Sequence, residues 1–255
     1  MNGPSFRHLY RTLLLALLLG GQTVYASAAI TVVTEELAPY NMTVDGKLTG
    51  MGTEVVQAVL DELGEPARIQ SMPWARAYDI ALNTENVLIY SIARTPQREA
   101  RFKWIGTIAP TRWYLFSLPG IQFNLANLDD ARQYQIATVK EDVGEQYLID
   151  RGFVVGRNLQ SSNKYEHNYE KLKAGRVDLW ISNELNAHYL VRQISGNPDE
   201  TAVPQLRLND LGGSNGLNMA FSRSTSDEVV ERFRQALARV HADGRYDAIA
   251  ARWLK

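Results

Sequence analysis

The feature that most limits the possible folds is a regular alternation of strand-like and helix-like segments, which begins at Ile30. The β-branched run ITVVTEE precedes TEVVQAVLDELG (residues 53–64), whose apolar residues recur at helical spacing. Thr53 can cap this helix and Gly64 can end it. Further segments of the same two kinds follow at residues 67–72, 73–82 and 87–93. The order strand, helix, strand predicts a parallel sheet covered by helices.

The middle of the chain contains a long apolar stretch, FKWIGTIAPTRWYLFSLPG (residues 102–120). Pro110 and Pro119 break it, which favours an extended segment that passes between two bodies. A second α/β series is then expected at residues 134–139, from 143, 153–155, 167–175, 177–182 and 184–194. Beyond the Gly-rich GGSNG, the pattern predicts a strand at 217–223 and helices at 227–244 and 246–254. These last helices need a sheet to cover, so we expect the chain to return to its first lobe.

The predicted fold class is therefore α/β, with two Rossmann-like lobes joined by a two-segment hinge. Lobe 1 is expected to comprise residues 29–114 and 212–255, and lobe 2 residues 115–211. In open α/β sheets, ligands lie beyond the carboxyl ends of the strands, where helix N-termini also point. Two such lobes placed face to face predict a ligand site between them.

The N-terminal segment has the three-part pattern of a cleavable signal peptide. Basic residues precede the apolar run from Leu13 to Leu19, and small residues from Ala26 follow it. That run is much shorter than the roughly 20 residues of a membrane-spanning helix. We expect cleavage after Ala26 or after Ala28, which leaves a secreted, soluble, periplasmic protein, and we assign residues 1–28 to the signal peptide and not to the fold. The absence of cysteine excludes disulfides and a lipid-accepting thiol.

Composition and motifs give no sign of an enzyme or of a nucleic-acid partner. The formal net charge of −1 does not favour binding to nucleic acid or to an anionic membrane. The histidines lack metal-ligand spacing and no phosphate-binding loop is present, so we expect neither a metal nor a cofactor. The G-x-S-x-G match at 212–216 lacks the preceding strand and following helix that a nucleophile elbow requires. A monomer that is not an enzyme is the expectation.

Five segments, in order over residues 30–254, carry a resemblance to a known family. They are ITVVTEELAPY with LTGMGTEVVQAVLDELG, IARTPQREARFKWIG, IATVKEDVGEQYL, KLKAGRVDLWIS and RFRQALARVHADGRYDAIAARWL. The chain resembles the periplasmic solute-binding proteins of polar-amino-acid ABC transporters, which are bacterial extracellular solute-binding proteins of family 3. The resemblance implies a type II periplasmic binding fold, hinge closure on a small-molecule ligand and membrane subunits of an ABC transporter as partners.

Arg98 is the leading candidate for a ligand-binding residue. Thr95 as N-cap and Pro96 at the first helical position place it in the first turn of a helix, where a cation opposes the macrodipole. Arg94 adds a second positive charge one turn earlier. A ligand carboxylate would satisfy both, and the resemblance places Arg98 on the carboxylate-binding arginine of the family.

Other candidates come from the ends of the predicted strands. By resemblance, Ser91 supplies a hydroxyl and Ala93 a backbone carbonyl. Asp142 is expected to cap a helix that offers the backbone N–H of Val143 to an anion. Asn183 stands where the family commonly places an aspartate that pairs with the α-ammonium of the ligand. Either Glu184 supplies the missing charge or the ligand lacks a free α-amino group.

Aromatic walls and one acid complete the predicted site. Tyr40 follows Pro39, where the family stacks an aromatic ring on the ligand, and Trp74 is the second aromatic candidate. Glu36 could meet a basic ligand group.

The expected function is capture of a small, carboxylate-bearing polar ligand, an amino acid or a relative, for an ABC transporter. One alternative is a periplasmic enzyme on the same scaffold, similar to cyclohexadienyl dehydratase, with Glu36 or Glu184 as general acid or base. Another is a sensory solute-binding protein that reports to a separate receptor.

Overall fold

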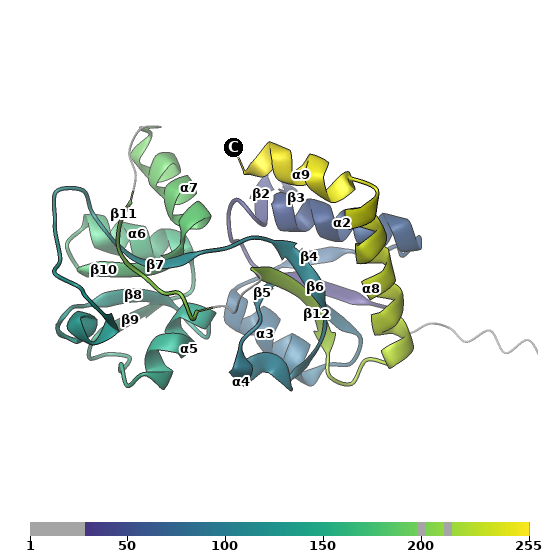
Figure 1. Cartoon of the computed structure of the whole chain (residues 1–255), viewed down its shortest axis with the longest axis horizontal. Helices are drawn as coiled ribbons and strands as arrows, with labels where there is room; N and C mark the ends of the chain where they lie inside the picture. The colour runs from purple at the N-terminus through teal and green to yellow at the C-terminus, as the bar shows by residue number, and fades with distance from the viewer. Residues whose placement is uncertain (1–28, 198–201, 212–215, 255) are drawn as a thin grey trace, which may run out of the picture.

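The computed structural model of the protein describes residues 29–197, 202–211 and 216–254. The predicted signal peptide and most of the Gly-rich segment at 212–216 lie outside the described residues. Figure 1 shows the described chain as two lobes, each built on its own sheet. The predicted α/β class with two lobes is confirmed.

The first sheet mixes parallel and antiparallel strands. β1 pairs with β4 and β5 in parallel, whereas β12 runs antiparallel to β5 and β6. Across the sheet, the order is β4 (Ile69–Ser71), β1 (Thr31–Thr34), β5 (Val87–Ala93), β12 (Leu217–Ser222) and β6 (Phe102–Ala109). A strand from the C-terminal third of the chain, β12, therefore lies inside this sheet, between β5 and β6.

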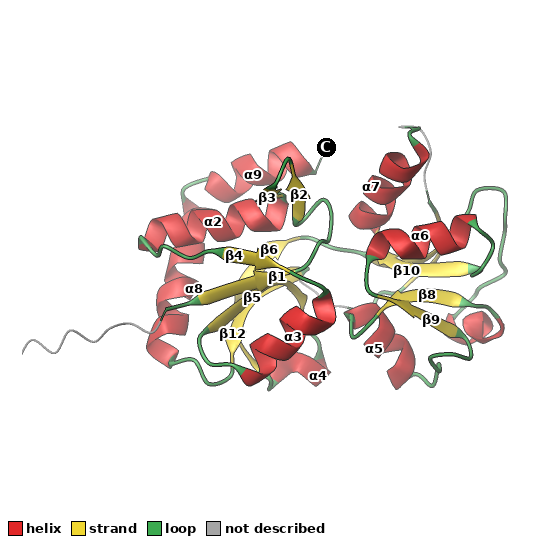
Figure 2. Ribbon diagram, turned by 180° about the vertical axis from the view of Figure 1, so that it is seen from behind, coloured by secondary structure: helices red, strands yellow, loops and turns green. Residues whose placement is uncertain are grey.

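Helices cover both faces of the first sheet (Figure 2). One face carries α2 (Met51–Leu63), α8 (Asp227–Ala242) and α9 (Arg245–Trp253), and the other carries α3 (Trp74–Asn83). A two-stranded hairpin of β2 (Met42–Val44) and β3 (Lys47–Thr49) lies beside α2, and α4 (Pro96–Glu99) follows β5. Of the two C-terminal helices, α8 covers the first sheet, as the sequence predicts, and α9 packs on α2 and α8.

The second sheet belongs to the middle of the chain. Its order is β11 (Val203–Arg207), β7 (Trp113–Ser117), β10 (Leu179–Asn183), β8 (Ile136–Val139) and β9 (Leu159–Ser162). It packs against α5 (Val143–Asp150), α6 (Tyr165–Lys173) and α7 (Glu184–Ser195), and the 3₁₀ turn η1 (Leu128–Gln133) precedes β8. The chain enters this sheet from β6 through residues 110–112 and leaves it after β11. The lobe boundary expected at 114/115 thus falls inside β7, a strand of the second sheet.

Some details differ from the sequence predictions. The strand expected at 153–155 is wrong, because Val155 makes only an isolated bridge to Leu159, and the edge strand beside β8 is β9. Thr53 does not cap α2, which begins two residues earlier; its hydroxyl lies 2.9 Å from the Tyr90 hydroxyl. Gly64 does end this helix, at a φ of 64° that favours glycine.

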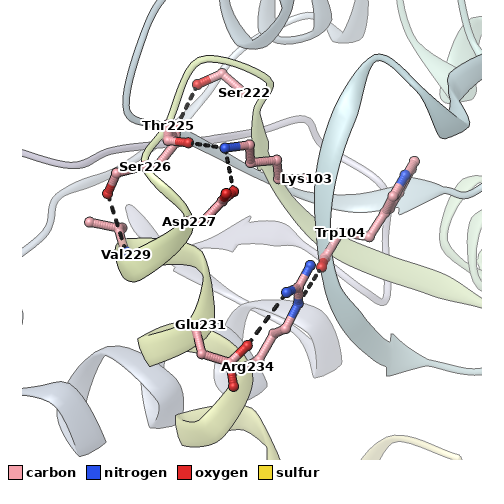
Figure 3. A network of polar contacts seen from close by, with 9 residues as sticks. All are labelled: Lys103, Trp104, Ser222, Thr225, Ser226, Asp227, Val229, Glu231 and Arg234. Atoms are coloured by element: carbon pink, nitrogen blue, oxygen red, sulfur yellow. Dashed lines mark hydrogen bonds and ion pairs between the residues drawn. The ribbon is translucent and has the colours of Figure 1, made fainter.

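Polar contacts at one end of the first sheet fix the returning helix α8 (Figure 3). Lys103 on β6 donates to the Thr225 carbonyl at 2.6 Å and pairs with Asp227 in the first turn of α8 at 2.5 Å. Arg234, two turns along α8, donates to the Trp104 carbonyl at 2.9 Å. These contacts join the last third of the chain to lobe 1.

Among the described residues, no helix combines the length and apolar character needed to cross a membrane.

Candidate ligand-binding cleft

The carboxyl ends of the parallel strands in the two sheets meet between the lobes. β1 leads into Glu35 and β5 into the segment that carries Arg98, while β8 leads to the start of α5 and β10 to the start of α7. Several direct hydrogen bonds cross this interface, two of them from Trp74 and Asn186. Trp74 Nε1 donates to the Glu141 carbonyl at 2.8 Å, and Asn186 Nδ2 donates to the Ala38 carbonyl at 2.7 Å. The lobes are therefore in contact, and the residues between them are buried.

Arg98 lies in this interface with only 1% of its surface exposed. Its guanidinium donates to the Ala93 carbonyl of lobe 1 at 3.3 Å. Across the cleft it donates to Gln146 Oε1 at 2.9 and 3.1 Å, and to the Glu141 carbonyl at 3.3 Å. All of these acceptors are neutral, and no carboxylate among the described residues forms an ion pair with it. The charges of Asp142 and Glu35 act on the guanidinium, but neither carboxyl contacts it directly, so this position can take an anionic ligand group as its direct partner.

Aromatic rings from α3 support the guanidinium. The rings of Trp74 and Tyr78 are stacked, with centroids 5.5 Å apart. The guanidinium carbon of Arg98 lies 5.3 Å from the Trp74 centroid and 4.9 Å from that of Tyr78. Trp74 thus helps to hold Arg98 and also contacts lobe 2. Thr95 occupies the N-cap position of α4 as predicted, although its side chain makes no capping bond.

A cluster of acidic groups lies in the same interface. Glu35 of lobe 1 and Asp142 of lobe 2 are only 4% and 6% exposed. The Tyr165 hydroxyl at the start of α6 donates to Glu35 Oε1 at 3.4 Å and is also hydrogen-bonded to the Asp142 carboxyl. Burial raises the pKa of Glu35 well above its usual range, and the Asp142 charge raises it further. Burial also raises the pKa of Asp142, although Arg98 opposes this shift.

The N-terminus of α5 is occupied by a side chain of the protein itself. Asp142 Oδ1 accepts from the backbone N–H of Val143 at 2.6 Å, so Asp142 caps the helix as predicted. Glu145 accepts from the backbone N–H of Glu141 at 3.0 Å. The Val143 N–H, predicted to face a ligand anion, therefore has a protein acceptor in this structure.

Two buried polar atoms at the strand ends lack partners among the described residues. Asn183 is fully buried; its Oδ1 accepts from the Asn186 N–H at 2.9 Å, and its Nδ2 has no partner. The Ser91 hydroxyl on β5 is also buried and without a partner, on a residue whose φ is 59°. Unsatisfied buried polar groups are rare, and a ligand is one reason for them.

The remaining candidates lie at the edges of the interface. Arg94 is half exposed and pairs with Glu99 at 2.5 Å. Glu36 accepts from the Thr43 N–H at 2.8 Å and from the Ser71 hydroxyl at 2.6 Å, contacts that tie the β2–β3 hairpin to β4. Neither side chain reaches Arg98 through a hydrogen bond.

Tyr40 and Glu184 lie on the side of the cleft nearest the lobe connection. The Tyr40 hydroxyl donates to the Pro110 carbonyl at 3.0 Å, and Glu184 pairs with Arg112 at 2.7 Å. Together with Thr111 and the residues around it, they line a cavity of about 400 Å³. Glu184 is therefore engaged with a neighbouring arginine of the chain.

Sequence reasoning missed Glu35 and Tyr165, and it treated Asp142 only as a helix cap. Glu35 is the first residue after β1, and the rule that ligands lie beyond the carboxyl ends of strands could have found it. Tyr165 opens α6 and carries no such signal, because its contact with Glu35 depends on how the two lobes dock.

A mixed-sheet lobe and a second α/β lobe that bury polar groups between them define a binding protein of the two-lobe kind. The sequence matches the family model of bacterial extracellular solute-binding proteins, family 3, over residues 30–255. The chain therefore belongs to this family, as the sequence resemblance predicted. No curated protein matches the sequence.

Solved structures share the fold at low sequence identity. A histidine kinase sensor domain with similarity to periplasmic binding proteins aligns with a TM-score of 0.78 and 20% identity, covering 89% of this chain and 96% of that one. An ancestral arginine-binding protein bound to arginine gives 0.76 and 19%, covering 89% and 98%. An ancestral amino acid-binding protein, a precursor of cyclohexadienyl dehydratase, gives 0.72 and 15%, covering 89% and 96%.

Proposed function

We propose that this protein is a periplasmic solute-binding protein that captures a small polar ligand bearing a carboxylate and presents it to the membrane subunits of an ABC transporter. The observation that carries the proposal is the position of Arg98, buried between the lobes with only neutral acceptors around its guanidinium. A ligand carboxylate would supply a directly hydrogen-bonded anion in the bidentate geometry that arginine favours.

The contacts of Arg98 support a sequence of binding and closure. In an open form, Arg98 and Trp74 of lobe 1 receive the carboxylate, and Ser91 and the Ala93 carbonyl supply further polar contacts. Closure then brings Gln146 and the N-terminus of α5 against the ligand. The ligand displaces acceptors that Arg98 uses in the empty protein, so binding and closure are coupled.

Glu35 supports the enzymatic alternative better than Glu36 or Glu184, the two acids that the sequence suggested. Glu36 and Glu184 are engaged in contacts at the rim, whereas Glu35 is a buried carboxyl whose pKa is raised well above its usual range by burial. A carboxyl group whose pKa is raised by burial is a candidate for general acid catalysis. Chemical conversion of a bound carboxylate would establish this second function.

A thermal-shift screen of the mature protein tests the proposal, with amino acids, opines, polyamines, organic acids and short peptides as ligands. A ligand at about 100 times its Kd stabilises the protein by roughly 2.7 kcal/mol, or about 5 to 11 °C in Tm at this size. The expected result is a large shift with a carboxylate-bearing compound that is recovered unchanged. No shift with any carboxylate would contradict the proposal, and recovery of a product would favour the enzyme.

A further inference from the structure

Asn183 has a buried, unpartnered hydrogen-bond donor at the carboxyl end of β10, and its role as helix cap fixes which side-chain atom is left free. The first turn of α7 offers a backbone N–H, so the side-chain oxygen must face Asn186 N, at 2.9 Å. Only the NH₂ group is left to face away from the helix, and it has no partner among the described residues. An NH₂ group cannot accept a hydrogen bond from an ammonium. This position therefore suits an oxygen of the ligand and not an α-ammonium.

Negative charge is concentrated elsewhere in the interface. Glu35 approaches from lobe 1 and Asp142 from lobe 2, and Tyr165 is hydrogen-bonded to both. In the part of the chain that the structure describes, Arg98 is the buried cation whose charge acts on both carboxyls. Two buried carboxylates and one guanidinium leave an excess of negative charge when both acids are ionised. Closing the lobes on this excess is unfavourable unless a proton or a positive ligand group balances it.

The three residues of this acidic cluster, Glu35, Asp142 and Tyr165, come from both lobes. A cation held among them would contact lobe 1 and lobe 2 together, and would thereby favour the closed form over the open one. A cation that touched one lobe alone would have no such effect. The placement of the acids therefore links ligand charge to closure.

We infer that the cleft binds an ammonium or guanidinium group that is not α to the ligand carboxylate, that this group lies between Glu35 and Asp142, and that Asn183 donates to an oxygen of the ligand. The inference rests on the proposed function and narrows its ligand to ω-amino and ω-guanidino acids. Arg98 keeps its place as partner of the carboxylate.

Four related compounds separate the groups of the ligand in calorimetric titrations of the mature protein. Arginine carries all three groups, guanidinopentanoate lacks the α-ammonium, norvaline lacks the guanidinium and agmatine lacks the carboxylate. A second set built on lysine repeats the comparison with an ammonium group. We expect the desamino compound of one set to bind within about threefold of the parent amino acid, and norvaline to bind at least about a hundredfold more weakly.

The results that overturn the inference are distinct from those that overturn the proposed function. The inference fails if the parent amino acid binds more than about tenfold tighter than its desamino analogue, if norvaline binds as tightly, or if neither set binds. If agmatine binds as tightly as guanidinopentanoate, the cation assignment stands and the carboxylate of the proposed function fails.

Glu35→Gln supplies a second test, which separates a role of Glu35 in ligand binding from a purely structural role. The substitution keeps the shape of the side chain and removes a charge that is unfavourable to bury, so the empty protein should keep or raise its Tm. Its affinity for the cationic ligand should fall by at least about tenfold. Glu85→Gln, which removes an exposed acid of lobe 1, should change neither. An unchanged affinity in Glu35→Gln would overturn the inference.

Discussion

The two lobes are built alike, yet they bring different chemistry to the cleft. Lobe 1 contributes two long side chains, Arg98 and Trp74. The Arg98 guanidinium lies over the Trp74 ring, and both side chains donate to the Glu141 carbonyl of lobe 2. Lobe 2 contributes the first residues of its helices, where Asp142, Tyr165 and Asn183 lie within one turn of a helix start. Similar strand ends therefore supply a cation and aromatic rings on one side and capping groups on the other.

This difference assigns the lobes different parts in binding. The aromatic support holds the Arg98 guanidinium on lobe 1 independently of lobe 2, so lobe 1 can receive a carboxylate before closure. The groups of lobe 2 are fixed by the helices they begin, so they reach the ligand only when the whole lobe moves. Under the proposed function, lobe 1 would govern affinity for the anion, and lobe 2, together with Glu35 of lobe 1, would govern which other groups the closed form accepts.

The largest effect is expected from Arg98→Ala, which breaks the contribution of lobe 1. Loss of a buried charge pair should weaken binding by about 2 to 5 kcal/mol, or roughly 30- to 4,000-fold in Kd. Calorimetric titration measures the change. Arg101→Ala removes an exposed arginine three residues further on and should leave Kd unchanged. Equal affinities for the wild type and Arg98→Ala would place the carboxylate elsewhere.

Asn183→Asp tests the contribution of lobe 2. Aspartate caps helices as well as asparagine does, so α7 should keep its first turn, while the carboxylate buried at a fully buried position should lower the Tm of the empty protein. The new carboxylate replaces a donor with a charged acceptor, and affinity for an α-amino acid such as norvaline should rise by about 1.5 to 3 kcal/mol, roughly 10- to 150-fold. Parallel titrations of both proteins with norvaline measure the gain. A variant that remains unable to bind α-amino acids would show that residue 183 does not select for this group.

How far the sequence could predict these two contributions also differs between the lobes. Arg98 was predictable because Thr95 and Pro96 mark the start of a helix at the end of a strand, a local signal. Asn183 was also predicted as a site residue, but its free NH₂ group follows from a hydrogen bond that only the structure reveals. Local capping chemistry locates a residue without specifying which of its atoms faces the ligand.

The acidic cluster was not predictable in the same way. The sequence indicates Glu36 as the acid of the site and not its neighbour Glu35, because a run of two acids does not reveal which side chain turns inward. Glu35 is buried against lobe 2, while Glu36 turns toward the β2–β3 hairpin. The partner of Glu35 is Tyr165, 130 residues away and on the other lobe. No periodicity within one lobe encodes a contact that forms only when two lobes close.

The pH dependence of binding tests the charge balance between the lobes. In the empty closed protein, burial and Asp142 raise the pKa of Glu35, while Tyr165 and Arg98 lower it and Glu166 raises it. The protonated acid therefore stabilises the empty closed form at low pH, and this contribution is lost as pH rises through the raised pKa. A bound cation favours the ionised carboxylate, so its binding releases a proton.

Affinity for a cationic ligand should consequently increase with pH, by up to about tenfold per pH unit for each proton released. The range extends from the ordinary carboxyl pKa to the raised pKa of Glu35. Titrations in buffers of different ionisation enthalpy count the protons directly. Glu35→Gln should flatten the dependence, and a wild-type affinity that is constant over this range would contradict the assignment of the cation to the acidic cluster.

The smallest effect is expected from Trp74→Phe, which weakens the contact between the lobes and leaves both lobes intact. Phenylalanine keeps the stacking on Tyr78 but lacks the indole N–H that donates to the Glu141 carbonyl of lobe 2 at 2.8 Å. One such hydrogen bond contributes about 0.5 to 1.5 kcal/mol, so Kd should rise roughly 2- to 13-fold. Small-angle scattering should show a larger fraction of open molecules without ligand. Trp104→Phe removes a comparable bond, to the Glu99 carbonyl within lobe 1, and should lower Tm while leaving Kd and closure unchanged. If Trp74→Phe, like Trp104→Phe, lowers Tm without changing Kd or the open fraction, the Trp74 hydrogen bond contributes to folding and does not hold the two lobes closed.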